Sequence, residues 1–317
     1  MAKAARALRL SAPPPPPPAA LPRVRARKAG QVQALVRLVR TVYPGCRRLV
    51  DVGAGTGHLT RALAAALGVE ALGIERDPAR VEAARALSGS GGPRFEARAV
   101  GPGGLELGPD DLAIGLHACG ALGDALVRAA VRGGARLLLV NCCLQKVDGV
   151  SRTPLSATGR RCGLVLAREA LGLSNLSARP RLVEGDHAQW VAVRRTRYAL
   201  RLLLAERGLA VAVGEEMRGL RRRHARHGLA ALAARACARR GLAPPTLAEL
   251  ARAEARARAD YGRLRRLSLP RALLGPLLEQ AVGLDRACLL EEAGRVVRLK
   301  RVFSWELSPR NLAVLAP

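Results

Sequence analysis

A glycine-rich loop between an apolar segment and a helical segment constrains the fold of this chain more than any other feature. Arg48–Val52 has the composition of a short buried strand, and it leads directly into Gly53, Gly55 and Gly57. Residues 58–67 follow with helical periodicity and end at a glycine, a common helix terminus. Glycine lets the backbone turn tightly and lets a ligand approach it without a Cβ in the way. The loop therefore predicts a strand–turn–helix unit with a binding site at the turn.

The same order of elements recurs after the loop. Asp77 is a good N-cap, and Pro78 suits the first position of the helix that follows. Strands alternating with helices predict a parallel sheet with right-handed crossovers, so we expect a Rossmann-like α/β core. The further segments of this pattern are predicted as strands at 70–74, 94–100, 111–116 and 135–140 and helices at 31–42, 78–87 and 121–131.

The composition changes along the chain and suggests four regions. Residues 1–27 contain no acidic residue and include Pro13–Pro18, which predicts a disordered tail rich in proline and arginine. Residues 28–195 hold the predicted core, and residues 196–290 form an Arg-rich helical insertion in which Thr246 and Glu249 match a capping box. Residues 291–317 contain two apolar segments, 296–303 and 312–315, which we expect to complete the sheet as a C-terminal β-hairpin.

An acidic residue strengthens the prediction of a cofactor site. Glu75 ends the second predicted strand, 18 residues after Gly57, where a carboxylate can accept both hydroxyls of a ribose. NAD and S-adenosylmethionine both contain such a ribose, and a tight turn without a ligand is the simpler alternative. The GxGxG spacing led by Asp51 departs from the GxGxxG of dehydrogenases and resembles the first motif of class I S-adenosylmethionine-dependent methyltransferases. We therefore predict S-adenosylmethionine bound by Asp51, Gly53, Gly55, Gly57 and Glu75. Many such enzymes carry an acid after the third strand that meets the adenine amino group; here Glu96 is expected to point elsewhere, so the adenine contact is left unassigned.

Two further motifs end the fourth and fifth predicted strands. His117 and Cys119 lie in the first, and Asn141, Cys142 and Cys143 form the second. Ligands of open α/β sheets bind beyond the carboxyl ends of the strands, so both motifs should face one pocket. We predict His117 and Asn141 as catalytic residues and the three cysteines as lining the substrate pocket. Packing of small polarisable side chains, and a metal site or cysteine nucleophile, are the alternatives; the spacing matches no usual metal motif, so no metal is predicted.

The net charge of +28 favours a polyanionic partner, and RNA is the partner we expect. The alternative is that the excess of arginine reflects a GC-rich genome. The seven cysteines form no CxxC pair, which is typical of reduced thiols and predicts a cytoplasmic protein. No apolar run is long enough and uncharged enough to cross a bilayer, so no membrane association is expected.

Several of these motifs together resemble a known family. Asp51–Gly57, Leu116–Gly120 and Cys142–Cys143 are similar to those of the eukaryotic methyltransferase-like proteins once labelled ribosomal RNA adenine dimethylase domain-containing. Thr153–Ser156, Leu284–Arg286 with Phe303, and Ser308–Asn311 extend the resemblance over residues 28–315. The family's basic-histidine-acid segment before the first helix is reduced here to residues 27–31. The resemblance implies a methyltransferase fold with a helical insertion before the last strands, and cofactor contacts at the glycine loop and Glu75.

The function predicted from the sequence is methyl transfer from S-adenosylmethionine to RNA. The alternatives are a methyltransferase acting on a small molecule or protein, an RNA-binding module without catalysis, and a dehydrogenase.

Overall fold

The structure is a computed structural model that describes residues 13, 24, 26–101, 103–116, 118–177 and 187–317. The predicted tail at residues 1–27 lies almost entirely outside this range, as does His117. The chain divides into two compact units, one of residues 1–180 with 271–317 and the other of residues 181–270.

The first unit is built on a sheet of seven strands in the order β3-β2-β1-β4-β5-β9-β8. The first five strands pair in parallel, and β9 pairs antiparallel with both β5 and β8. The predicted Rossmann-like sheet with a closing C-terminal hairpin is therefore confirmed. The strands are β1 (Arg48–Val52), β2 (Glu70–Glu75), β3 (Arg94–Ala97), β4 (Asp111–Leu116), β5 (Arg136–Val140), β8 (Arg298–Arg301) and β9 (Leu312–Ala316).

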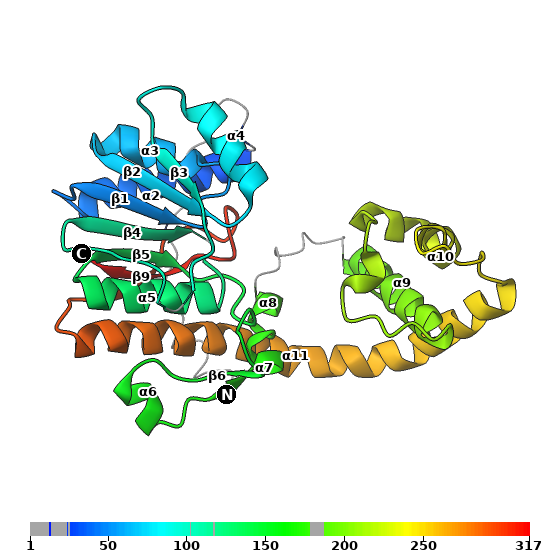
Figure 1. Ribbon diagram of the computed structural model, residues 1–317. Helices are drawn as coiled ribbons and strands as arrows, with labels where there is room; N and C mark the ends of the chain where they lie inside the picture. Colours follow the sequence, from blue (N-terminus) through cyan, green and yellow to red (C-terminus); the bar gives the residue numbers. More distant parts are fainter. Residues whose placement is uncertain (1–12, 14–23, 25, 102, 117, 178–186) are drawn as a thin grey trace. The chain divides into compact units, whose positions relative to one another are not determined.

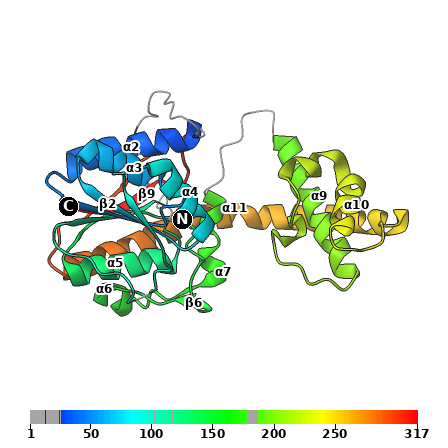
Figure 2. The ribbon, with the colours of Figure 1, turned by 45° about the horizontal axis from the view of Figure 1, so that its top comes forward.

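Helices cover both faces of this sheet (Figures 1 and 2). On one face, α2 (Ala26–Val42) and α3 (His58–Leu67) bury Val32, Leu35 and Leu63 against the strands. On the other face, α5 (Ala121–Gly133) and the end of α11 (Leu247–Glu292) bury Leu126 and Leu290. The stripes of Val, Leu and Ala at helical spacing supply this burial, at roughly 1.5–3 kcal/mol for each large side chain.

Shorter elements connect these layers. Asp77 caps α4 (Pro78–Ser88), since its carboxylate accepts the Ala79 N–H at 3.1 Å, as the sequence predicted. The segment after β5 forms a small two-stranded sheet and three short helices: β6 (Ser151–Arg152), α6 (Ala157–Arg161), β7 (Leu166–Ala167), α7 (Arg168–Leu171) and α8 (Ser174–Ser177).

The second unit is helical, as the sequence predicted. It contains α9 (His187–Glu206), the 3-10 turns η1 (Glu215–Met217) and η2 (Arg222–His227), α10 (Gly228–Ala238) and the beginning of α11. The capping box before α11 forms, because Glu249 accepts the Thr246 N–H at 2.7 Å. The predicted bounds of the insertion, 196–290, differ from those of the observed unit, 181–270. The ends differ because α11 continues unbroken into the first unit, where its last turns pack on the sheet. Among the described residues, no helix has the length and apolar character to span a membrane.

Candidate functional site

The glycine loop lies between β1 and α3, at the carboxyl edge of the sheet. The N–H groups of Gly53 and Ala54 donate to the Ile74 carbonyl at 2.8 and 3.1 Å, which ties the loop to β2. Gly55 has φ +61°, and a Cβ placed on it would meet no atom within 4 Å. Gly57 has φ +72°, and its Cβ would lie 2.4 Å from the Phe95 ring. Gly55 therefore leaves open space beside the loop, whereas Gly57 is needed for packing behind it.

Glu75 turns toward this loop from the end of β2. Its Oε2 accepts the Gly55 N–H at 3.0 Å, and its Oε1 accepts the Asp77 N–H at 3.2 Å. Glu75 is 8% exposed, and the two hydrogen bonds fix the position of its carboxylate. Each oxygen keeps a lone pair that can accept a hydroxyl hydrogen. This is the arrangement that ribose recognition requires, although contact with a ribose stays a prediction.

Asp51 lies below the loop. It is 2% exposed, and its Oδ2 accepts the Thr60 hydroxyl at 2.7 Å. Burial raises the pKa of Asp51 to about 6, against the lowering effects of the Thr60 hydrogen bond and of Lys28. Asp51 is therefore bonded to the first turn of α3 through Thr60. Asp51 does not line the neighbouring cavity.

A cavity of about 920 Å³ opens above the loop. Its size and its mixed polar and apolar walls fit a ligand as large as S-adenosylmethionine. Predicted site residues Gly53, Gly55, Glu75 and Cys119 line it, while Gly57 does not. The open face of Gly55 and the lone pairs of Glu75 thus fit the amino-acid and ribose parts of such a donor. The other lining residues are Lys28, Val52, Ala54, Thr56, His58, Ile74, Arg76, Arg80, Arg98, Ala99, Val100, Gly101, Leu116, Ala121, Leu122, Ala125, Lys146, Val147 and Asp148.

Residues 98–101, which follow β3, also line the cavity. Glu96 does not line the cavity, and its carboxylate lies 3.5 Å from the guanidinium of Arg98. The absence of an acidic lining residue from β3 agrees with the expectation that Glu96 points elsewhere.

The sequence reasoning missed every basic residue of the cavity wall, and two of these residues lie on α2 and α3. Lys28, in the first turn of α2, and His58, at the start of α3, both line the cavity. Burial lowers the pKa of Lys28, while the charge of Asp51 opposes this effect. Burial also lowers the pKa of His58, as do the charges of Arg61 and Lys28. The sequence carries a signal in the lysine near the start of the first helix, but its place in the cavity wall depends on the packing of α2 beside α3.

The two strand-end motifs meet beside the cavity. The Sγ atoms of Cys119, Cys142 and Cys143 all lie within 4.8 Å of one another, although the residues follow different strands. Cys119 lines the cavity, Cys142 is buried, and Cys143 is half-buried. Hydrogen bonds from the thiols of Cys119 and Cys142 lower the pKa of Cys143, with help from Arg310 and Lys146. None of the seven cysteines forms a disulfide bond.

Asn141 lies deeper than the cysteines. It is fully buried, and its Oδ1 accepts from Arg286 Nη1 at 2.5 Å, while its Nδ2 has no hydrogen-bond partner among the described residues. A Cβ on Gly283 of α11 would come within 3.3 Å of this Nδ2, and Asn141 does not line the cavity. The structure thus places Asn141 between β5 and α11, where it joins a buried ionic network.

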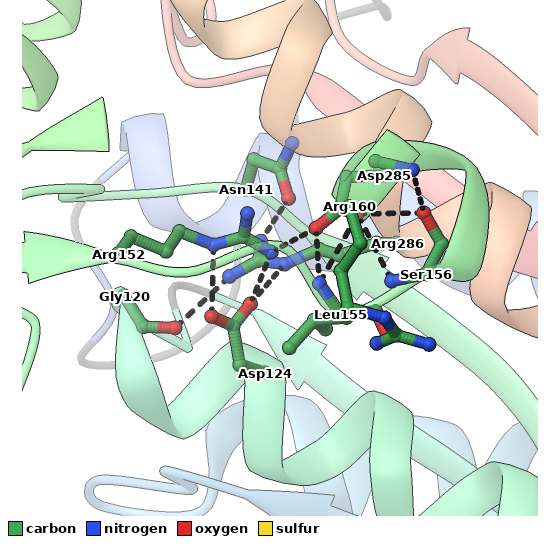
Figure 3. Close-up of polar contacts among 10 residues, drawn as sticks. Gly120, Asp124, Asn141, Arg152, Leu155, Ser156, Arg160, Asp285 and Arg286 are labelled. Atoms are coloured by element: carbon green, nitrogen blue, oxygen red, sulfur yellow. Dashed lines mark hydrogen bonds and ion pairs between the residues drawn. The ribbon is translucent and has the colours of Figure 1, made fainter. Parts of the chain in front are cut away.

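This network holds both strand ends in place (Figure 3). Arg286 also donates to Asp124 Oδ1 at 2.8 Å and to the Gly120 carbonyl at 2.9 Å. Arg152 pairs with Asp124 at 2.9 Å and with Asp285 at 2.7 Å. Two buried cations therefore face two carboxylates, and the groups that neutralise one another come from α5, β6 and α11.

Two motifs quoted for the family resemblance contact each other through Asp285. Its carboxylate accepts the Leu155 N–H at 2.9 Å and the Ser156 hydroxyl at 2.8 Å. Glu292 similarly accepts the Ala157 N–H at 2.8 Å. The Thr153–Ser156 motif is thus bonded directly to the end of α11, beside the site. In the C-terminal motif, Asn311 donates to the Phe303 carbonyl at 2.8 Å.

The comparison with protein families agrees with this geometry. Residues 27–150 match the model of a methyltransferase domain, which includes the glycine loop, Glu75 and both strand-end motifs. The match covers less than half of the chain, so it does not assign the whole chain to a family.

Solved structures similar to this chain include three methyltransferases. A TehB-like SAM-dependent methyltransferase from Corynebacterium glutamicum is 17% identical, with 33% of this chain and 60% of that chain covered and a TM-score of 0.28. A SAM-bound amino pentose methyltransferase from Micromonospora echinaspora is 24% identical, with 35% and 50% covered and a TM-score of 0.29. A tRNA (uracil-54, C5)-methyltransferase from Pyrococcus abyssi is 22% identical, with 36% and 29% covered and a TM-score of 0.30.

The match therefore spans between about a third and three fifths of these solved chains. Residues 27–150 thus match a methyltransferase domain, and they hold the five parallel strands of the Rossmann-like sheet.

Proposed function

We propose that this protein transfers the methyl group of S-adenosylmethionine to RNA. The observation that supports methyl transfer best is the single cavity that joins Gly55 and Glu75 to Cys119 and Lys146. A donor bound at the loop and an acceptor entering beside the strand ends would share one space. Such a shared space is what an in-line displacement needs, because positioning alone can lower the barrier by several kcal/mol.

The chain's own groups would mainly bind, orient and exclude water. The bound donor supplies an electrophilic methyl group on a sulfonium. Glu75 would hold its ribose, and the open backbone at Gly55 would admit its amino-acid end. Lys28 offers a cation to the carboxylate of that end. The predicted role of His117 in orienting or deprotonating the acceptor is part of this proposal, although His117 lies outside the described residues. Asn141 would act indirectly, through Arg286 and the strand end it follows.

The RNA part of the proposal is supported by charge in the helical unit. Residues 181–270 contain 20 arginines and 8 acidic residues. Arg221 and Arg223 are exposed beside η2, and Arg235 is exposed on α10. Desolvation lowers the pKa of His224 most, and the charges of Arg235, Arg223 and Arg221 lower it further. Such a concentration of cations attracts phosphates.

Aromatic rings accompany some of these cations. The Arg194 guanidinium lies 4.5 Å from the centroid of the Trp190 ring on α9, and Arg201 lies 5.1 Å from that of Tyr198. Rings beside guanidinium groups are the kind of surface on which the bases of single-stranded RNA stack.

Transfer of radiolabelled methyl groups to total RNA tests the proposal. We expect label in RNA, and affinity for RNA that falls as salt rises. The double variant Arg221→Gln/Arg223→Gln should reduce the log–log salt slope by about 0.7–0.9 for each arginine removed. A matched control is Arg256→Gln, because Arg256 already lies 3.8 Å from Asp260. Label that enters only proteins or small molecules would overturn the RNA part.

The rival functions make different predictions. A methyltransferase of small molecules or proteins would show activity without RNA and without dependence on salt. An RNA-binding module without catalysis would bind RNA but have no affinity for the donor. Membership of the eukaryotic methyltransferase-like family and a cytoplasmic location belong to the proposal as well. The contact between the motifs at Asp285 supports the family, and cysteines that form no disulfide bond support the location.

A further inference from the structure

We propose that Cys119, Cys142 and Cys143 form a binding site for a thiophilic divalent metal ion such as Zn²⁺. The cluster is built by two segments that are far apart in the sequence, one after β4 and the other after β5. The site is independent of the donor-binding function, since it uses none of the groups at the glycine loop.

The spacing of the sulfur atoms fits a metal. The thiols of Cys142 and Cys143 are 3.6 Å apart, and all three sulfurs lie within 4.8 Å of one another. Zn–S bonds of about 2.3 Å at tetrahedral angles put ligand sulfurs about 3.8 Å apart. Three thiols already near this separation need only small rotations to bind one ion.

The backbone around the cluster holds the sulfurs together. The Ala121 N–H donates to the Lys146 carbonyl at 2.8 Å, and the Lys146 N–H donates to the Cys143 carbonyl at 3.2 Å. Gly120 makes this contact possible, because a Cβ there would lie 1.9 Å from the Lys146 oxygen, and its φ is +47°. Arg286 fixes the Gly120 carbonyl from the other side. These contacts supply the rigid support that metal ligands require.

The cavity wall also supplies a compensating charge. Zn²⁺ with three thiolates carries one net negative charge, and Lys146 places a cation in the cavity wall that includes Cys119. Cys119 and Lys146 line the cavity, so the fourth coordination position would be reached from it. Three protein ligands with an open fourth position are typical of zinc sites that bind a water or a substrate.

The test uses the full chain, kept reduced with a phosphine and stripped of metal. Zn²⁺ is added in competition with a chromophoric chelator, and Co²⁺ is used as a spectroscopic probe. We expect one equivalent of Zn²⁺ and a thiolate-to-cobalt charge-transfer band. Cys119→Ser and Cys143→Ser should each weaken the band and the binding of Zn²⁺, because one thiolate fewer binds the ion. Gly120→Ala should weaken Zn²⁺ binding by about 10–100-fold, as expected when the support of a ligand is removed.

The matched control is Cys162→Ser, because Cys162 is exposed and lies outside the cluster. It should bind Zn²⁺ like the wild type. A second measurement needs no variant: Zn²⁺ should protect Cys119, Cys142 and Cys143 of the wild-type chain from alkylation, but not Cys162. Wild-type protein that retains no Zn²⁺ against the chelator, or alkylation that Zn²⁺ does not change, would overturn the proposal. Neither result would affect the test of donor binding.

Discussion

Arg286 offers the strongest test of how the site is held together. Its side chain is fully buried, and it donates to Asp124, Asn141 and the Gly120 carbonyl. Substitution by methionine keeps the unbranched apolar part of the side chain but removes one cation from a network of two cations and two carboxylates. One buried carboxylate is then uncompensated, because Arg152 cannot neutralise both Asp124 and Asp285.

The expected loss of stability follows from this imbalance. Removing one partner of a buried ion pair costs about 3–5 kcal/mol, because the remaining charge stays buried. We therefore expect Arg286→Met to lower the free energy of unfolding by about 3–5 kcal/mol. Arg286→Lys should be intermediate, since an ammonium keeps the charge but cannot reach all three acceptors in the same geometry.

Urea unfolding followed by circular dichroism measures the effect. The double variant Arg286→Met/Asp124→Asn restores the charge balance, so it should be more stable than Arg286→Met alone. Double-mutant cycles of this kind isolate the coupling between two groups in contact. A loss below about 1 kcal/mol for Arg286→Met, or a double variant no more stable than the single one, would refute the reasoning.

Three further predictions concern the glycine loop and its neighbours. Gly57→Ala should lower the thermal midpoint more than Gly55→Ala, because its Cβ would lie 2.4 Å from Phe95, whereas that of Gly55 meets nothing within 4 Å; equal midpoints in differential scanning calorimetry would contradict this. Asp51→Asn should stabilise the chain at neutral pH, because the raised pKa of about 6 makes ionisation of Asp51 costly as pH rises from about 4 to 6. The gain should approach about 3 kcal/mol at pH 7 and vanish near pH 4, and a gain that does not change with pH in urea titrations would count against it. Lys28→Met should weaken binding of S-adenosylhomocysteine about tenfold or more but leave 5′-methylthioadenosine unaffected, since only the former has a carboxylate; equal losses in calorimetry would exclude the predicted contact.

Much of the fold could be predicted because local signals and tertiary structure agree here. Strand β1 and helix α3 have the predicted bounds, because an apolar run meets a glycine loop and a glycine ends the helix. The end of the insertion was not predictable in the same way. A polar, Arg-rich pattern shows that a helix forms, but it does not show that one helix, α11, serves both units.

The candidate site was predictable only in part, and for a similar reason. Gly55 and Glu75 follow strands that the sequence marks clearly, so their meeting could be expected. Asn141 follows a strand just as clearly, yet its environment depends on Arg286, which lies 145 residues further along the chain. Lys28 reaches the cavity because α2 packs beside α3, and no local pattern reports such packing.

Calorimetric titration of the full chain with S-adenosylmethionine tests the central claim most directly. The account predicts one binding site per chain, with affinity that falls about tenfold or more in Glu75→Gln, because the neutral amide accepts hydroxyl hydrogens less strongly than the carboxylate. Absence of binding, or an affinity that Glu75→Gln leaves unchanged, would contradict the claim that the glycine loop and Glu75 together hold the methyl donor.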